Sequence, residues 1–376
     1  MTRSWQSFSC ESIHAILSQP NHRRHHAARV HLARDRDSAY HFPRVSESIL
    51  ADQGPKECGQ DVRAPNEVRA PIIAIVGPTA SGKSELGIEL AQRIGGEIVN
   101  CDSVQVYQGI QIATAKVPLS ERRGVPHHLI DFVSPLVNFT AADWARAANE
   151  KIEEIEGRGR SALLVGGTGF YLRALRQPFF DSPPTDEELR ARLTQIREQR
   201  GPEHLHRLLQ RFDAAEAAKL NPRDWPRVQR AIEFCLQTGE PISRQRPLRP
   251  EPPSLASRIR IIALSPPRQE LYARINKRTE THFANGLVEE VRRLLEEGVP
   301  ANSNALGAHG YRRVVEFLRG RRDLDSAIEQ TKLDVRHYAK RQLSWFRHEP
   351  GVQWLEGFGD DPDVQAKAYR LSSGSV

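Results

Sequence analysis

The sequence has few cysteines and no long apolar run. Its 376 residues include only four cysteines, which lie far apart and form no CxxC pair. This spacing argues against a disulfide scaffold and against a zinc module, and it fits the reducing cytoplasm. No stretch of about 18 apolar residues is present to span a bilayer. We therefore expect a soluble, cytoplasmic protein without a membrane partner.

The positive charge is concentrated in one part of the chain. The protein carries 54 basic and 47 acidic residues, a net charge of +7. Residues 258–347 hold 18 basic and 11 acidic residues, whereas residues 71–180 hold 11 of each. A local surplus is typical of a surface that binds a polyanion, and such binding weakens with salt. Charge alone is equally compatible with a basic protein that binds no nucleic acid.

Apolar patterning divides the chain into five segments. Residues 1–70 hold six of the fourteen histidines and no sustained apolar period, which predicts a disordered extension that activity does not need. The other four segments are a first part of an α/β core (71–180), a helical insertion (181–257), a return strand with basic helices (258–347) and a C-terminal tail (348–376).

Strands and helices alternate in the first half of the core. Short apolar runs predict strands at 72–76 and 96–102, and a third that runs into a glycine turn at 161–171. Helices are expected over 84–93 and 140–159, the latter begun by a capping box of Thr140 and Asp143. This alternation predicts an α/β fold with a doubly wound parallel sheet.

The second half of the sequence is mainly helical. The pattern predicts helices over 184–201, 224–239, 266–297, 311–319 and 325–347, a proline-rich linker at 244–253 and a strand at 258–264. Thr185 and Glu188 have the spacing of a second capping box. Asp224 is expected to begin a helix that Gly239 ends.

A phosphate-binding loop follows the first predicted strand. The residues Gly77, Pro78, Thr79, Ala80, Ser81, Gly82, Lys83 and Ser84 match GxxxxGK[ST]. In such a P-loop, backbone N–H groups and the helix N-terminus converge on phosphate oxygens. Lys83 would neutralise the terminal phosphates, and Ser84 would ligate Mg²⁺. The motif predicts a bound diphosphate or triphosphate, but not its hydrolysis.

The carboxylate that a hydrolytic NTPase needs is missing from its usual place. The apolar strand at 162–165 leads into Gly166-Gly167-Thr168, whereas Asp102 follows the preceding strand. Carboxyl ends of parallel strands line the ligand crevice, so Asp102 and Thr168 should face the diphosphate held by Lys83. Alternatively, Asp102 caps a turn and Thr168 is only a turn residue.

Several motifs occur in an informative order. They are GPTASGKS (77–84), DSVQVY (102–107), PHHLID (126–131), GGTGFYLRAL (166–175), RVQRAIE (227–233), GYRR (310–313) and YAKRQLSWFR (338–347). With these motifs the chain closely resembles the bacterial tRNA dimethylallyltransferases (tRNA isopentenyltransferases) of the P-loop superfamily. The resemblance covers about residues 71–356. It implies a P-loop NTPase-like parallel sheet flanked by helices, with an all-helical insertion domain.

The resemblance also implies a reaction. A dimethylallyl group would move from dimethylallyl diphosphate to N6 of adenosine 37 of tRNA, with release of diphosphate. The P-loop would hold the donor's diphosphate rather than ATP. Lys83, Thr168 and Mg²⁺ at Ser84 would stabilise the leaving diphosphate. Asp102 would act as the general base that accepts a proton from N6.

The same resemblance implies where tRNA binds. The target base would leave its stack and meet Ser103 and Gln105. The implied tRNA contacts are Asp102, Ser103, Val104, Gln105, Thr168, Arg190, Pro226, Arg227, Val228, Gln229, Arg230, Gly307, Tyr311, Arg312, Lys340, Arg341 and Arg347. Two segments depart from the family pattern: Trp225-Pro226-Arg227 has proline in place of glutamine, and Gly307-Ala308-His309 ends in histidine instead of an apolar residue.

Three other functions stay open at this point. A P-loop small-molecule kinase would turn over ATP, and the DSVQ and GGTGFY motifs speak against it. An isopentenyltransferase for free adenine nucleotides would need no RNA surface, whereas residues 258–347 are basic. A non-catalytic RNA-binding protein would not need Lys83, Ser84, Asp102 and Thr168 together. The expected partners are therefore the tRNA anticodon arm and dimethylallyl diphosphate, bound by a monomer.

Overall fold

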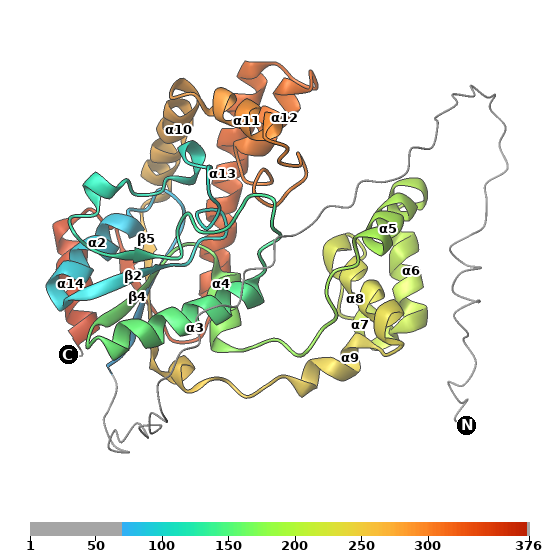
Figure 1. The fold of residues 1–376 in the computed structure, drawn as a ribbon, viewed down its shortest axis with the longest axis horizontal. Helices are drawn as coiled ribbons and strands as arrows, with labels where there is room; N and C mark the ends of the chain where they lie inside the picture. The colour runs from blue at the N-terminus through green and yellow to red at the C-terminus, as the bar shows by residue number, and fades with distance from the viewer. Residues whose placement is uncertain (1–69, 374–376) are drawn as a thin grey trace, which may run out of the picture. The chain divides into compact units, whose positions relative to one another are not determined.

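A six-stranded parallel sheet forms the centre of the protein. The computed structural model describes residues 70–373 (Figure 1), so the predicted extension at 1–70 lies outside the described residues except for Ala70. The strands follow the order β3-β2-β4-β1-β5-β6, and every neighbouring pair is parallel. They span Ile72–Val76 (β1), Gly96–Asn100 (β2), His127–His128 (β3), Ser161–Val165 (β4), Ile259–Ser265 (β5) and Val352–Glu356 (β6). The predicted α/β class is confirmed.

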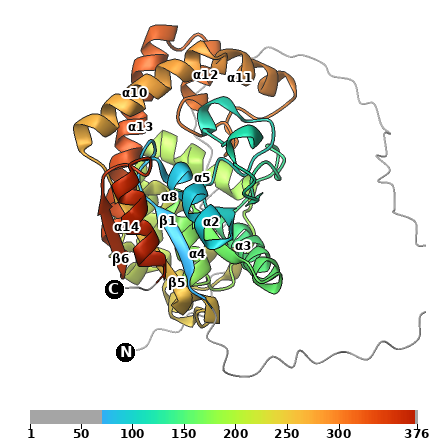
Figure 2. The same ribbon diagram turned by 90° about the vertical axis from the view of Figure 1, so that its left-hand side faces the viewer.

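Helices cover both faces of this sheet (Figure 2). On one face, α2 (Lys83–Ile94) and α14 (Pro362–Ser373) pack against Ile73 and Ile75 of β1. On the other face, α3 (Ala141–Gly157) and α4 (Gly169–Arg176) pack against alternate residues of the same strand. A strand covered on both faces is apolar at every position, which explains why β1 reads as the unbroken run IIAIV.

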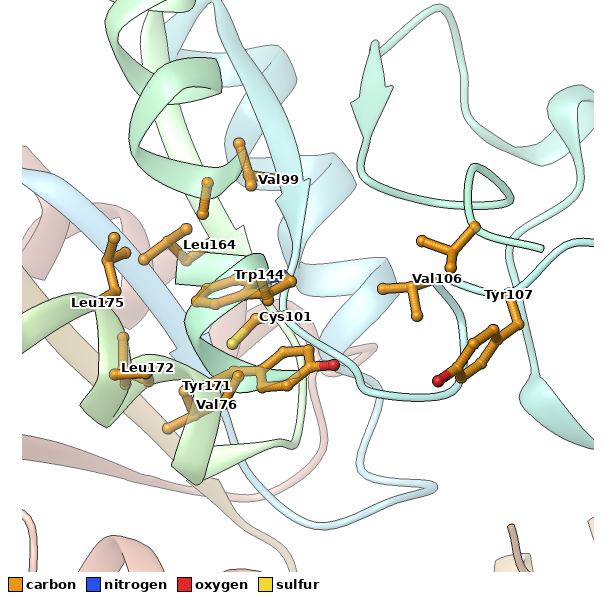
Figure 3. Close-up of a cluster of buried hydrophobic side chains, with 14 of the residues drawn as sticks. Val76, Val99, Cys101, Val106, Tyr107, Trp144, Leu164, Tyr171, Leu172 and Leu175 are labelled. Carbon is orange, nitrogen blue, oxygen red and sulfur yellow. The ribbon is translucent and has the colours of Figure 1, made fainter. Parts of the chain in front are cut away.

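An aromatic stack anchors α3 and α4 to the carboxyl end of the sheet. The rings of Trp144 and Tyr171 lie 4.9 Å apart and nearly parallel, next to Cys101 and Leu164 (Figure 3). The indole Nε1 of Trp144 donates to the carbonyl of Asn100 at 2.9 Å. These contacts fix Asn100 and Cys101, the two residues that lead into Asp102.

The helical insertion has a core of its own. It contains α5 (Glu187–Arg200), α6 (Pro202–Phe212), α7 (Ala214–Ala217), α8 (Trp225–Thr238) and α9 (Ile242–Gln245), coloured yellow-green to yellow in Figure 1. Leu193, Leu209, Val228 and Ile232 are fully buried among these helices. After β5 the chain forms α10 (Arg268–Ala284), α11 (Leu287–Glu296), α12 (Tyr311–Leu318) and α13 (Leu324–Arg347). Among the described helices, none is both long and apolar enough to cross a bilayer.

Local signals predicted several helix ends correctly. Thr140 accepts from the Asp143 N–H while the Asp143 side chain accepts from the Thr140 N–H, which confirms the predicted capping box. Asp224 and Gly239 flank α8 as predicted. The second capping box was wrong: Asp186, not Thr185, caps α5 by accepting from the Leu189 N–H at 2.9 Å. Asp186 is one residue closer to the helix.

Three segments differ from the sequence prediction. The predicted strand at 161–171 runs into its glycine turn after Val165 as expected, but the last three residues, from Gly169, already belong to α4. The single helix expected over 266–297 is two helices, broken at Gly286, whose φ is +91°. The predicted tail at 348–376 contains β6, which pairs with β5, and α14.

Candidate active site

The P-loop joins β1 to α2 in the expected conformation. Gly82 has a φ of +84° and precedes the first residue of the helix. A Cβ atom at Gly82 would lie only 2.8 Å from the backbone nitrogen of Gly359, so this position requires glycine. Gly359 also donates its N–H to the carbonyl of Ser81 at 2.9 Å. The loop between β6 and α14 therefore supports the P-loop from behind.

The groups of the P-loop suit an anionic ligand. Lys83 and Ser84 line a cavity of about 700 Å³. The Lys83 amine donates to the Pro78 carbonyl at 2.6 Å. Ser81 lines the same cavity, and its buried hydroxyl oxygen has no hydrogen-bond partner among the described residues. Buried polar atoms are normally satisfied, so this oxygen fits a site that is completed by a bound ligand.

Burial perturbs the charge of Lys83. The pKa of Lys83 falls to about 7 from an ordinary value of 10.5, mainly because the amine is buried; the Asp102 charge opposes this shift and the Arg278 charge adds to it. A buried amine of this kind gains its proton most easily when an anion enters the cavity. The site is therefore prepared for a phosphate group.

Asp102 and Thr168 meet at the carboxyl ends of β2 and β4. Asp102 Oδ1 accepts from the backbone N–H groups of Val104 at 2.9 Å and Gln105 at 3.3 Å. Thr168 Oγ1 accepts from the Ser103 N–H at 3.0 Å, and the Thr168 N–H donates to the Cys101 carbonyl at 3.1 Å. Both residues shape the turn around them, and both also line cavities. Asp102 therefore does both things that the sequence left open: it caps a turn, and it lines the site.

Two cavities meet at Asp102. The first contains the P-loop, and the second, of about 690 Å³, contains Ser103, Val104 and Thr168. Five residues line both cavities: Thr79, Asp102, Thr114, Arg278 and Tyr338. A donor in the first cavity and an acceptor in the second would therefore touch beside the Asp102 carboxylate.

Three residues at this junction were missed by the sequence analysis. The Gln342 amide joins the P-loop to the β4 turn, because it accepts from the Thr79 N–H at 2.8 Å and donates to the Gly167 carbonyl at 2.9 Å. The Arg278 guanidinium donates to the Thr79 hydroxyl. Tyr338 lines both cavities next to Asp102.

Tyr338 and Gln342 both lie in the motif YAKRQLSWFR (338–347), and the helix pattern gave a second signal for Gln342. It shares the buried face of α13 with Ala339 and Phe346, at three- and four-residue steps, and a polar residue on an apolar helix face is unusual. Arg278 is one of many arginines in 258–347, and no motif separates it from the rest.

The chain offers oxygen ligands for Mg²⁺ beside the P-loop. Ser84 and Asp102 line the same cavity as Lys83. No group of three or more His, Cys, Asp or Glu side chains among the described residues could hold a metal by itself. This donor set fits Mg²⁺, which is commonly held by one or two protein oxygens together with substrate phosphates and water.

The predicted tRNA contacts differ in exposure. Arg190 and Gly307 line the second cavity. Pro226, Arg227, Arg312, Lys340, Arg341 and Arg347 are exposed. The Gln105 amide donates to the Thr114 carbonyl at 2.9 Å within the site. Arg190, Gly307 and the exposed residues are available to a large ligand, whereas Gln105 lines only the first cavity and its amide donor is already engaged.

Three predicted contacts face inward instead. Val228 and Gln229 are buried in the insertion, where Gln229 Nε2 donates to the Arg190 carbonyl at 2.8 Å. Tyr311 is fully buried, and its hydroxyl donates to Glu290 at 2.5 Å. Side chains at these positions stabilise the fold and are not exposed for binding.

A buried carboxylate holds the arginines of the insertion. Glu233 is fully buried, and its Oε2 accepts from Arg190 at 3.2 Å and from Arg230 at 3.0 Å. Arg230 also donates to the Pro183 carbonyl at 2.8 Å. Glu233 thus fixes the arginine that reaches the second cavity.

Comparison with known proteins agrees with this geometry. The family model described as IPP transferase matches residues 105–349. The chain is 46% identical over 298 residues to the tRNA dimethylallyltransferase of Solibacter usitatus, covering 79% of this chain and 96% of that protein. It is also 46% identical over 293 residues to the tRNA dimethylallyltransferase of Geobacter metallireducens, covering 77% and 94%.

Solved structures give the same result. The full-length tRNA isopentenylpyrophosphate transferase of Bacillus halodurans matches with a TM-score of 0.60 and 36% identity, over 81% of this chain and 96% of that one. A eukaryotic dimethylallyltransferase acting on tRNA matches with a TM-score of 0.66 and 28% identity, over 81% and 79%.

A parallel sheet with a phosphate-binding loop that opens onto a second cavity defines a two-substrate transferase of the P-loop-like α/β class. The chain belongs to the IPP transferase family, together with these tRNA dimethylallyltransferases. The resemblance drawn from the sequence motifs is confirmed, and the protein is a prenyltransferase.

Proposed function

We propose that the protein transfers a dimethylallyl group from dimethylallyl diphosphate to N6 of adenosine 37, in the anticodon arm of tRNA. The observation that carries this proposal is the position of Asp102, which lines both the cavity with the P-loop and the second cavity beside it. The names of the relatives supply the two substrates.

The first cavity is the proposed donor site. Lys83, the amides of the P-loop and Arg278 would bind the diphosphate, and Thr168, which lines the second cavity, would hydrogen-bond to it across the junction. Mg²⁺ at Ser84 would supply further positive charge next to the phosphates. As the allylic C–O bond breaks, negative charge grows on the leaving diphosphate, and these fixed groups stabilise it.

The second cavity is the proposed acceptor site. A flipped adenosine would present its N6 amino group to the dimethylallyl carbon at the junction. Asp102 Oδ1 already accepts from two backbone N–H groups, so Oδ2 is the atom that would take the amino proton. A new C–N bond replaces the C–O bond, the proton passes to Asp102, and diphosphate leaves.

The exposed basic residues would bind the rest of the anticodon arm. Lys340, Arg341 and Arg347 lie on α13, whose Tyr338 and Gln342 line the donor cavity. Phosphate contacts from such residues position the RNA and weaken with salt. We further propose that the protein acts as a monomer in the cytoplasm.

The direct test is incubation with labelled dimethylallyl diphosphate and unmodified tRNA, followed by nucleoside analysis. Label is expected on N6 of one adenosine next to the anticodon, with one diphosphate released per transfer. Free adenine nucleotides serve as competing acceptors, and ATP turnover is measured in parallel. Labelling of free nucleotides in preference to tRNA, or conversion of ATP to ADP with a small acceptor, would contradict the proposal.

A further inference from the structure

A tryptophan and an arginine stack on each other at the far end of the α5–α8 pair. The Arg197 guanidinium lies 4.0 Å from the centroid of the Trp225 ring. Trp225 is 37% exposed although it is a large aromatic residue. It stands at the first position of α8 and is not among the buried residues of that helix.

The α5 helix reaches the acceptor cavity through Arg190, and α8 packs beside it. α5 and α8 lie side by side (Figure 1), and Gln229 of α8 donates to both the Arg190 carbonyl and the Thr194 hydroxyl of α5. Arg190 lines the cavity. Arg197 follows it by two helical turns, or about 10 Å along the axis. If the target base lies in the acceptor cavity, a neighbouring nucleotide of the same RNA loop can span the distance from Arg190 to Arg197.

The charge around the stacked pair favours an RNA ligand. Within three residues of Arg197 and Trp225, the chain carries Arg200, Arg223 and Arg227 against the carboxylates of Glu198 and Asp224. Arg200, Arg223 and Arg227 are all exposed. Positive charge next to an open aromatic ring is the combination that binds unpaired bases, through stacking and phosphate contacts.

We propose that Trp225 and Arg197 form a stacking site for an unpaired base of the RNA substrate, outside the acceptor cavity. This inference rests on the proposed function, because it takes the RNA in that cavity as given. The site holds a base by its ring face, so it contributes to RNA affinity and not to the chemical step.

The test replaces Trp225 and measures tRNA and donor kinetics separately. Trp225→Ala is expected to raise the KM for tRNA by about 5- to 150-fold, the range for loss of one base–aromatic stack. The kcat at saturating tRNA and the KM for dimethylallyl diphosphate stay within about twofold. Trp225→Phe keeps a ring and should recover most of the affinity.

Two further variants separate stacking from other effects. Trp225→Leu keeps apolar volume without a π-face and should be as weak as Trp225→Ala. Trp354, on β6, is similarly exposed at 36%, and Trp354→Ala should match the wild type. The salt dependence of tRNA binding should keep its slope in Trp225→Ala, since no phosphate contact is lost.

An unchanged KM for tRNA in Trp225→Ala, or a Trp225→Leu variant that binds as tightly as the wild type, would overturn the stacking site while leaving the proposed reaction intact. Failure of the wild-type protein to modify tRNA at all would instead overturn the proposed function. A loss of kcat with unchanged KM would also contradict the stacking site, because it would place Trp225 in the chemical step.

Discussion

Gln342 accepts a hydrogen bond from the backbone N–H of Thr79, a residue 263 positions earlier in the chain. The same side chain donates to the Gly167 carbonyl. One amide of α13 thus connects the loop proposed to hold the donor with the turn that carries Thr168. The relative position of these two segments depends on it.

Replacing Gln342 should disturb donor binding more than overall folding. Gln342→Leu leaves the Thr79 N–H and the Gly167 carbonyl without their partner, which costs about 1–3 kcal/mol for an unsatisfied buried group. We expect a KM for dimethylallyl diphosphate at least about tenfold higher, measured by steady-state kinetics at saturating tRNA. Gln342→Glu keeps the acceptor but has no donor for Gly167, and should also be impaired.

Gln330→Leu is the matched control on the same helix. Among the described residues, the Gln330 side chain bonds only to the neighbouring Asp334, so its loss should leave donor kinetics unchanged. If Gln342→Leu and Gln330→Leu have the same KM for dimethylallyl diphosphate, the hydrogen bonds of Gln342 to Thr79 and Gly167 do not position the P-loop.

Asp102 should be required for transfer and not for tRNA binding. Asp102→Asn keeps an oxygen for the Val104 and Gln105 N–H groups but cannot take up the N6 proton. Loss of a general base typically costs about 10²–10⁴-fold in rate. We expect a loss in single-turnover rate of at least this size for Asp102→Asn and Asp102→Ala, with tRNA affinity within a few fold by filter binding. Near-normal turnover of either purified variant would refute the general-base role.

Donor affinity should weaken as pH rises above about 7. In the free protein burial lowers the pKa of Lys83 to about 7, so the amine is charged below this pH and mainly neutral above it. A diphosphate prefers the charged form, and binding then takes up a proton. The Kd for dimethylallyl diphosphate, measured by calorimetry, should rise by up to about tenfold per pH unit above 7.

Lys83→Arg provides the control for this profile, because arginine stays charged throughout the range. The Kd of Lys83→Arg for dimethylallyl diphosphate should not change from pH 6 to 9. If the Kd of the wild-type protein does not change either, the protonation of Lys83 does not control donor binding. The stability of the ligand-free protein should change in the opposite direction. Between pH 7 and 10.5 the unfolded state binds more protons at Lys83, so stability in urea should rise with pH across that window.

Glu233 should matter for stability and for tRNA together. Glu233→Gln removes the charge that Arg190 and Arg230 share in a fully buried position. We expect the free energy of unfolding to fall by about 1–3 kcal/mol, and the KM for tRNA to rise because Arg190 is no longer held. Denaturant unfolding and kinetics measure the two effects.

Glu188→Gln tests whether any charge loss on the insertion has the same result. Glu188 pairs with Arg192 at the surface and is 77% exposed, so its change should stay within about 0.5 kcal/mol. If the two variants behave alike, Glu233 has no special positioning role.

The parts of the fold that the sequence predicted are those fixed by local chemistry. The P-loop and β1 combine a spaced motif with an unbroken apolar run, and Thr140 reaches only three residues to Asp143. By contrast, β6 buries only Leu355 fully and pairs at the sheet edge, so its sequence lacks a strong strand pattern.

The site was harder to predict where it depends on distant contacts. Gln342 matters for the site because it hydrogen-bonds to Thr79 and Gly167, and both residues lie more than 170 positions away in the sequence. Tyr311 next to Arg312 reads as a nucleic-acid contact, yet its ring fills the core and its hydroxyl satisfies Glu290. The sequence does not distinguish a tyrosine that is buried in the core from one that contacts nucleic acid, because the difference lies in the packing around it.

The hydrogen bond from Gly359 to Ser81 joins two segments that are made at different times during protein synthesis. A growing chain emerges from its N-terminus, so the P-loop leaves the ribosome long before Gly359 does. Until Gly359 docks, the Ser81 carbonyl lacks its backbone donor and the donor cavity lacks its rear support. The donor cavity is therefore complete only after β6 and α14 have been made and the loop between them has packed against the P-loop.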